Sequence, residues 1–151
     1  MNGLALKELA RNLALVMHEG QCRKATGEPY FNHVERVAMA VKGWEAQTVA
    51  YLHDVVEDTR FSEQALRLIF PIHLCNAVMR LTRDPAKETY AEFIERVTSL
   101  PALPERALAI EVKIADVKDN FGSLDNIPGD TSTKEKRYTK ALAKLLEARD
   151  G

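Results

Sequence analysis

The spacing of apolar residues is the feature that most limits what this chain can fold into. These residues recur at intervals of three and four along almost the whole sequence, which is the periodicity of one helix face. The first expected helix carries Leu6, Leu9, Leu13, Val16 and Met17, and the second carries Val34, Val37, Ala38 and Val41. The alternation of apolar and polar residues that is typical of a strand is hard to find. The sequence therefore predicts an all-α protein.

Capping and helix-breaking residues divide the chain into about eight expected helices. Beyond the first two, we expect helices over residues 45–57, after 62, over 71–81, 88–98, 105–120 and 133–148. Ser62 is expected to cap the fourth helix, and Pro71 to lie in the first turn of the fifth. Ser132, followed by Glu135, matches a capping box for the last helix. Residues 122–130 are expected to form a loop.

Length and composition predict a single domain over residues 1–151. A chain of 151 residues is of ordinary domain size, and no linker rich in Pro, Gly or Ser divides it. Its 21 basic and 22 acidic residues exclude the strongly basic character typical of proteins that bind polymeric nucleic acid. The arrangement of these helices is expected to be one helical bundle.

The sequence also predicts a cytoplasmic protein without a membrane span. No apolar run approaches the roughly 18 residues that a span requires. Lys7, Glu8 and Arg11 lie where a signal peptide would keep an uncharged core. The two cysteines, Cys22 and Cys75, are too few for a disulfide framework, so we expect buried thiols in a reducing compartment.

A short segment places a histidine and three carboxylates among apolar residues: His53, Asp54, Glu57 and Asp58. On a continuous helix, His53 would lie above Glu57 and Asp54 above Asp58. Partly buried carboxylates need a cation or hydrogen-bond donors, yet residues 44–58 contain no lysine or arginine. Imidazole and carboxylate together suit divalent Mn, Fe or Zn. The sequence thus favours a metal site, with a solvated helix face as the alternative.

Two further residues are candidate ligands of the same metal. His33 lies near the start of the second helix, and Asp116 lies in a mostly apolar stretch where an unpaired carboxylate would be out of place. Asn120 shares a helix face with Asp116. The alternatives are that His33 caps its helix or lies on the surface, and that Asp116 forms an ion pair with Lys113 or Lys118.

A histidine, a later His–Asp pair and a distal aspartate on a helical chain resemble the HD-domain superfamily of metal-dependent phosphohydrolases. Three motifs in order, over residues 18–33, 52–59 and 113–120, more specifically resemble the hydrolase domain of RelA/SpoT-type stringent-response proteins. The resemblance covers roughly residues 4–146. The synthetase and regulatory domains of the long family members are absent from this sequence, so the resemblance implies a stand-alone small alarmone hydrolase.

The resemblance implies a role for each matching residue. The ligands of a single metal ion, usually Mn²⁺ in this family, would be His33, His53, Asp54 and Asp116. The acidic pair that orients or deprotonates the attacking water would be Glu57 and Asp58. The nucleotide pocket would be lined by Arg23 and Lys24, with Asn120 and Tyr138 contacting ribose or phosphate. Without the flanking motif, Arg23 and Lys24 would be interpreted as a solvated loop. For Tyr138, a core aromatic residue remains the alternative even with the resemblance.

The activity that the resemblance implies is removal of the 3′-pyrophosphate from guanosine tetra- or pentaphosphate. One alternative is a phosphatase acting on another nucleotide such as NADPH, and another is a catalytically silent binding or regulatory domain. Two departures from the family pattern, Arg60 and Phe121-Gly122-Ser123, affect the expected substrate rather than the metal ligands. The sequence assigns no role to His18 or His73, and it does not predict an oligomeric state.

Overall fold

The computed structural model describes residues 1–24 and 26–151, and within them it contains nine α-helices, one 3₁₀ helix and no β-strand. In chain order the elements are α1 (Gly3–Met17), α2 (Tyr30–Ala40), α3 (Trp44–Leu52), α4 (Val55–Asp58), α5 (Glu63–Ile69), α6 (Ile72–Arg80), α7 (Tyr90–Thr98), α8 (Pro104–Gly122), η1 (Ser123–Asn126) and α9 (Ser132–Asp150). The predicted all-α fold is confirmed.

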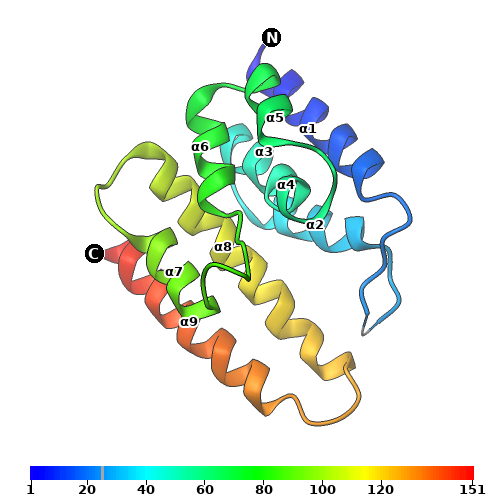
Figure 1. Ribbon diagram of the computed structural model, residues 1–151, viewed down its shortest axis with the longest axis vertical. Helices are drawn as coiled ribbons and strands as arrows, with labels where there is room; N and C mark the ends of the chain where they lie inside the picture. Colours follow the sequence, from blue (N-terminus) through cyan, green and yellow to red (C-terminus); the bar gives the residue numbers. More distant parts are fainter. Residues whose placement is uncertain (25) are drawn as a thin grey trace.

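Helices α3 and α8 form the centre of the molecule. Helices α1, α2 and α6 pack against α3, and α8 in turn contacts α2, α3, α6, α7 and α9 (Figure 1). Six of the nine residues of α3 are buried, including Val49, Ala50 and Leu52. A helix that is apolar on most sides must lie inside a domain. Helices α8 and α9 run side by side in opposite directions (Figure 1).

The helix expected over residues 45–57 is interrupted. Helix α3 ends at Leu52 and α4 begins at Val55, and Asp54 between them has φ −110° and ψ 0°. In a continuous helix the Ala50 carbonyl would accept a hydrogen bond from the amide of residue 54. Here it accepts from the amide of His53 at 3.4 Å and faces the ring Nδ1 of His53 at 2.5 Å. The predicted stacking of His53 over Glu57 on one continuous helix is therefore wrong. Asp54 does lie one turn before Asp58, as predicted, because the Asp58 amide donates to the Asp54 carbonyl at 2.9 Å.

Most other helix boundaries lie within one or two residues of their predicted places. Ser62 caps α5 by accepting from the amide of Ala65 at 3.1 Å, as expected. Pro71 precedes α6 instead of lying inside it. The capping box predicted at Ser132 is wrong, because Thr131 is the N-cap and the Ser132 amide donates to Asp130.

A capping box is present instead at α7, between Thr89 and Glu92. The loop expected over residues 122–130 contains η1, so that part of the prediction is also wrong. Across the part of the chain that the structure describes, no helix combines the length and apolar character needed to cross a membrane.

Candidate active site

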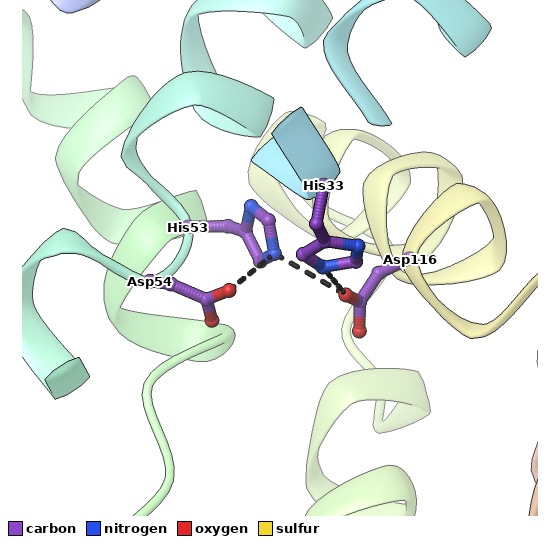
Figure 2. A group of neighbouring side chains, drawn as sticks. All are labelled: His33, His53, Asp54 and Asp116. Carbon is purple, nitrogen blue, oxygen red and sulfur yellow. Dashed lines mark hydrogen bonds and ion pairs between the residues drawn. The ribbon is translucent and has the colours of Figure 1, made fainter. Parts of the chain in front are cut away.

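Three parts of the fold bring together the four residues predicted as metal ligands. His33 lies in the first turn of α2, His53 and Asp54 lie in the turn between α3 and α4, and Asp116 lies on α8. One ligand atom from each residue lies within 4.8 Å of the others. Figure 2 shows the side chains converging, with His33 Nε2 2.8 Å from Asp116 Oδ1 and His53 Nε2 2.9 Å from Asp54 Oδ2. We refer to these four residues as the donor cluster.

Both histidines turn the same ring nitrogen toward the donor cluster. The Nδ1 atom of His53 donates to the Ala50 carbonyl, and the Nδ1 atom of His33 lies 2.6 Å from Asp119 Oδ2. A ring that donates through Nδ1 can keep a lone pair on Nε2 for a metal. His53 Nε2 is buried and faces two carboxylates, Asp54 Oδ2 at 2.9 Å and Asp116 Oδ1 at 3.4 Å, without the geometry of a hydrogen bond to either. This nitrogen and the N/O donor set around it fit a divalent cation.

The charges around the donor cluster shift the pKa values of its members. Burial lowers the pKa of both histidines, but the neighbouring carboxylates outweigh burial, so the pKa of His33 and His53 is raised. Burial alone would raise the pKa of Asp116, because it disfavours the charged carboxylate. Its pKa is nevertheless held well below the usual range by Lys113 and by the two histidines.

Asp116 uses its two carboxylate oxygens in different directions. Its Oδ2 accepts from the ammonium group of Lys113 at 2.7 Å, while its Oδ1 faces His33 and His53. The ion pair with Lys113, considered from the sequence as an alternative to a metal site, is therefore present together with the donor cluster. Lys113 Nζ also lies 4.9 Å from the ring centre of Phe93, a favourable cation–π arrangement.

The predicted acidic pair lies on α4 beside the donor cluster. Asp54, Glu57 and Asp58 place carboxylate oxygens within 4.8 Å of one another, so Asp54 belongs to both groups. Glu57 Oε1 accepts from the Arg83 amide at 2.6 Å. Although Asp58 remains exposed on one side, partial burial and then the charges of Asp54 and Glu57 raise its pKa to about 7. Burial likewise raises the pKa of Glu57.

A pocket of about 480 Å³ adjoins these groups, and all four residues predicted to bind substrate line it. These are Arg23, Lys24, Asn120 and Tyr138, and the wall also includes Tyr30 and Asp58. Arg23 donates to Asn120 Oδ1 at 2.7 Å and to Asp119 Oδ2 at 3.2 Å, so it is not part of a freely solvated loop. Tyr138 lines the pocket and also packs its ring 6.4 Å from that of Tyr90.

Several residues that contact these groups were assigned no role from the sequence. The Tyr30 hydroxyl donates to Asp54 Oδ2 at 2.5 Å, which holds that carboxylate toward α2. His18 is buried, with Nδ1 2.9 Å from Gln21 Oε1. Asp119 contacts His33 and Arg23, and its position three residues after Asp116 is the signal that would have revealed it.

The two cysteines differ in exposure. Cys75 is buried as predicted, but the prediction for Cys22 is wrong, because this thiol is exposed at the wall of the pocket. Its place in the pocket explains the exposure.

His73 pairs with Glu45 on the outside of α3 and lies apart from the donor cluster. Of the residues that depart from the family pattern, Ser123 lines the pocket and Phe121 is partly exposed.

Comparison with known proteins places these features in context. The chain is 30% identical over 144 residues to the bifunctional (p)ppGpp synthase/hydrolase SpoT of Escherichia coli, covering 89% of the chain and 20% of that protein. It is 31% identical over 141 residues to a probable guanosine-3′,5′-bis(diphosphate) 3′-pyrophosphohydrolase of Synechocystis, covering 87% of the chain and 18% of that protein. No protein-family model matches the chain.

A solved structure, described as a metazoan orthologue of SpoT that hydrolyses ppGpp, matches over 97% of this chain and 86% of its own, with a TM-score of 0.78 and 26% identity. The chain is similar to SpoT-type hydrolases in both sequence and fold. The predicted resemblance is therefore confirmed. The chain spans about a fifth of the length of the SpoT-type curated relatives it matches. The donor cluster and the SpoT-type likeness together indicate a divalent metal ion.

Proposed function

We propose that the protein is a metal-dependent pyrophosphohydrolase that removes the 3′-pyrophosphate from guanosine tetra- or pentaphosphate. The observation that carries this proposal is that two residues of the pocket wall lie directly beside Asp54 of the donor cluster. Tyr30 and Asp58 line the pocket, while Tyr30 bonds to Asp54 and Asp58 lies beside it. A nucleotide in this pocket, which is of ordinary ligand size, would thus have a phosphate group next to the proposed metal.

The proposed metal ligands are His33, His53, Asp54 and Asp116, and the proposed ion is Mn²⁺. Two imidazoles and two carboxylates are donors that Mn²⁺ accepts. When bound, the ion would supply Lewis-acid stabilisation of charge on the phosphoryl oxygens. Lys113 already compensates one Asp116 oxygen, which leaves the other oxygen for the metal.

Glu57 and Asp58 are the proposed groups that handle the proton of the attacking water. With a pKa of about 7, Asp58 is substantially ionised at neutral pH and can still hold a proton that it accepts at Oδ1 or Oδ2. The Arg83 amide fixes Glu57 Oε1, so Glu57 can orient the water. In the proposed reaction water attacks phosphorus, the bond to the ribose 3′ oxygen breaks, and that oxygen leaves as a hydroxyl.

The other pocket residues would bind the rest of the nucleotide. Arg23 and Lys24 supply positive charge, and each can form charge-assisted hydrogen bonds with phosphate oxygens. Asn120 and Tyr138 would contact the ribose or a phosphate. Asn120 also holds one guanidinium nitrogen of Arg23, which limits the directions in which Arg23 can bind.

Incubation of the purified protein with Mn²⁺ and guanosine tetraphosphate tests the proposal. Chromatography is expected to show GDP and pyrophosphate in equal amounts. Glu57→Gln and Asp58→Asn are each expected to lower kcat by at least about 100-fold, since each removes a proton acceptor. Glu111→Gln, which neutralises an exposed carboxylate on α8, is the matched control and should leave kcat unchanged. Absence of pyrophosphate release would refute the proposal.

The two alternative functions are separated by the same assay. NADPH is supplied in a parallel reaction, where formation of NADH and inorganic phosphate without any turnover of guanosine tetraphosphate would favour the phosphatase. Binding of either nucleotide without turnover, in a protein with one equivalent of bound metal, would favour a silent binding domain.

A further inference from the structure

Asp119 lies between the donor cluster and the pocket, and it contacts a residue of each. Its Oδ2 accepts from His33 Nδ1 at 2.6 Å and from Arg23 at 3.2 Å. Arg36 donates to both oxygens, at 2.7 Å to Oδ1 and at 3.1 Å to Oδ2. The Asp119 side chain is 16% exposed. Three cationic or donor groups from two different segments thus converge on one carboxylate of α8.

We propose that Asp119 is a positioning residue that orients His33 toward the metal and Arg23 toward the pocket at the same time. The His33 half of the proposal depends only on the donor cluster. The Arg23 half rests on the proposed function, because Arg23 is there a ligand of the nucleotide.

The effect on His33 follows from the chemistry of imidazole. A carboxylate at Nδ1 keeps the proton on that nitrogen, fixes the ring plane and makes Nε2 a better metal donor. His53 receives the same orientation from the neutral carbonyl of Ala50. His33 alone of the two rings has a charged acceptor, so the loss of that acceptor should weaken the metal site measurably.

The effect on Arg23 follows from the number of its donors. A guanidinium group carries five N–H bonds in a fixed plane. Asp119 and Asn120, which are neighbours on α8, each accept one of them through a different terminal nitrogen. Two such bonds fix the plane of the group relative to α8. The remaining N–H bonds then keep a defined direction when a ligand enters the pocket.

Asp119 is itself held in place by Arg36. Arg36 donates to both oxygens of Asp119 and also to both oxygens of Glu28. These bonds stop the Asp119 carboxylate from rotating, and they balance its charge. A purely structural ion-pair network that ties α2 to α8 would look the same, so the test must measure more than stability.

The first measurement is a calorimetric titration of the metal-free protein with Mn²⁺. Asp119→Asn is expected to raise the Kd for Mn²⁺ by about tenfold or more, the effect typical of losing a bond to a ligating histidine. Asp125→Asn removes an exposed carboxylate of η1 near the same end of α8 and should change Kd less than twofold. A Kd for Asp119→Asn within twofold of the unmodified protein would overturn the proposal.

NMR of the Zn²⁺-loaded protein is the second measurement, with the Arg23 signal assigned from its loss in Arg23→Lys. In Asp119→Asn, rotation of the Arg23 guanidinium about its Nε–Cζ bond is expected to become several-fold faster. Unchanged rotation would overturn the joint role, even with weaker Mn²⁺ binding. Neither measurement uses a nucleotide, so failure of the proposed hydrolysis leaves both readouts valid.

Asp119→Glu is a second test variant, needed if Asp119→Asn fails to fold. It keeps the charge that balances Arg36 but places the carboxylate one methylene further along the side chain. It is expected to keep the stability of the unmodified protein and to bind Mn²⁺ several-fold more weakly. Unmodified affinity for Mn²⁺ in this variant would overturn the proposal in the same way.

Discussion

At the scale of single residues, Lys113 is a largely buried cation, with a side chain 11% exposed, whose ion-pair partner is Asp116. Removing one member of a buried pair leaves the other charge uncompensated, which typically costs about 3–5 kcal/mol. We expect Lys113→Ala to lower the free energy of unfolding of the metal-free protein by about that amount, measured by urea denaturation.

The matched control for this prediction is Lys118→Ala, which truncates an exposed lysine on the same helix. It should change the unfolding free energy by less than about 0.5 kcal/mol, as is usual for surface substitutions. A loss below 1 kcal/mol for Lys113→Ala would show that the donor cluster does not depend on this cation.

The two histidines of the donor cluster predict how metal binding depends on pH. Their raised pKa values mean that the metal-free protein holds protons on them above the usual range, and these protons compete with a metal. The affinity for Mn²⁺ is therefore expected to increase as the pH rises through these pKa values, with protons released on binding. Calorimetry in two buffers of different ionisation enthalpy counts the protons. Zero release at pH 7 would contradict this assignment.

Residue types predicted the donor cluster, but the contacts that support it were not all predictable. His33 and Asp119 are 86 positions apart, and Tyr30 and Asp54 are 24 apart. Such pairs depend on how α2, α8 and the α3–α4 turn pack. The pairing of Lys113 with Asp116 was foreseen as one alternative because these residues are three apart on one helix.

At the scale of the helices, apolar periodicity predicted the order of the elements but one α-helix too few. The described residues contain nine α-helices where about eight were expected, because the helix predicted over residues 45–57 is broken between α3 and α4. The residues of this turn are compatible with a helix, but at the break the His53 ring takes the Ala50 carbonyl, and a side chain can compete with the backbone in this way. The competing side chain is that of His53, and its Nε2 faces Asp116 of α8, which is far away in the sequence. Local sequence alone therefore predicted a continuous helix.

The contact between α1 and α3 provides a test of packing at this scale. A Cβ atom on Gly3 would lie 2.4–2.7 Å from ring atoms of Trp44, which opens α3. Overpacking of this kind typically costs about 1–3 kcal/mol. Gly3→Ala is expected to lower the unfolding free energy by that amount in urea denaturation.

Gly122→Ala is the corresponding control. It adds the same methyl group to a helical backbone, and the new Cβ would meet no neighbouring atom within 4 Å. It should leave stability unchanged or raise it by about 0.4–1 kcal/mol. Equal effects of the two substitutions would mean that Trp44 moves aside at no cost.

At the scale of the whole molecule, the donor cluster joins α2, the α3–α4 turn and α8. A metal bound there would hold three segments together only in the folded state. Mn²⁺ at 100 times its Kd is expected to raise the unfolding free energy by about 2.7 kcal/mol. Excess EDTA should reverse this gain and abolish the proposed hydrolysis of guanosine tetraphosphate. Equal unfolding free energies with and without Mn²⁺ would argue against the site.

Three residues with proposed roles share one helix, and this arrangement limits how the protein can diverge. Asp116, Asp119 and Asn120 lie within about one turn of α8. A single-residue insertion or deletion before them would rotate all three by about 100° and would remove the donor cluster and the pocket wall together. Under the proposed function, insertions or deletions that alter nucleotide preference but keep the metal are therefore expected on the other walls, such as those with Lys24 and with Tyr138 of α9.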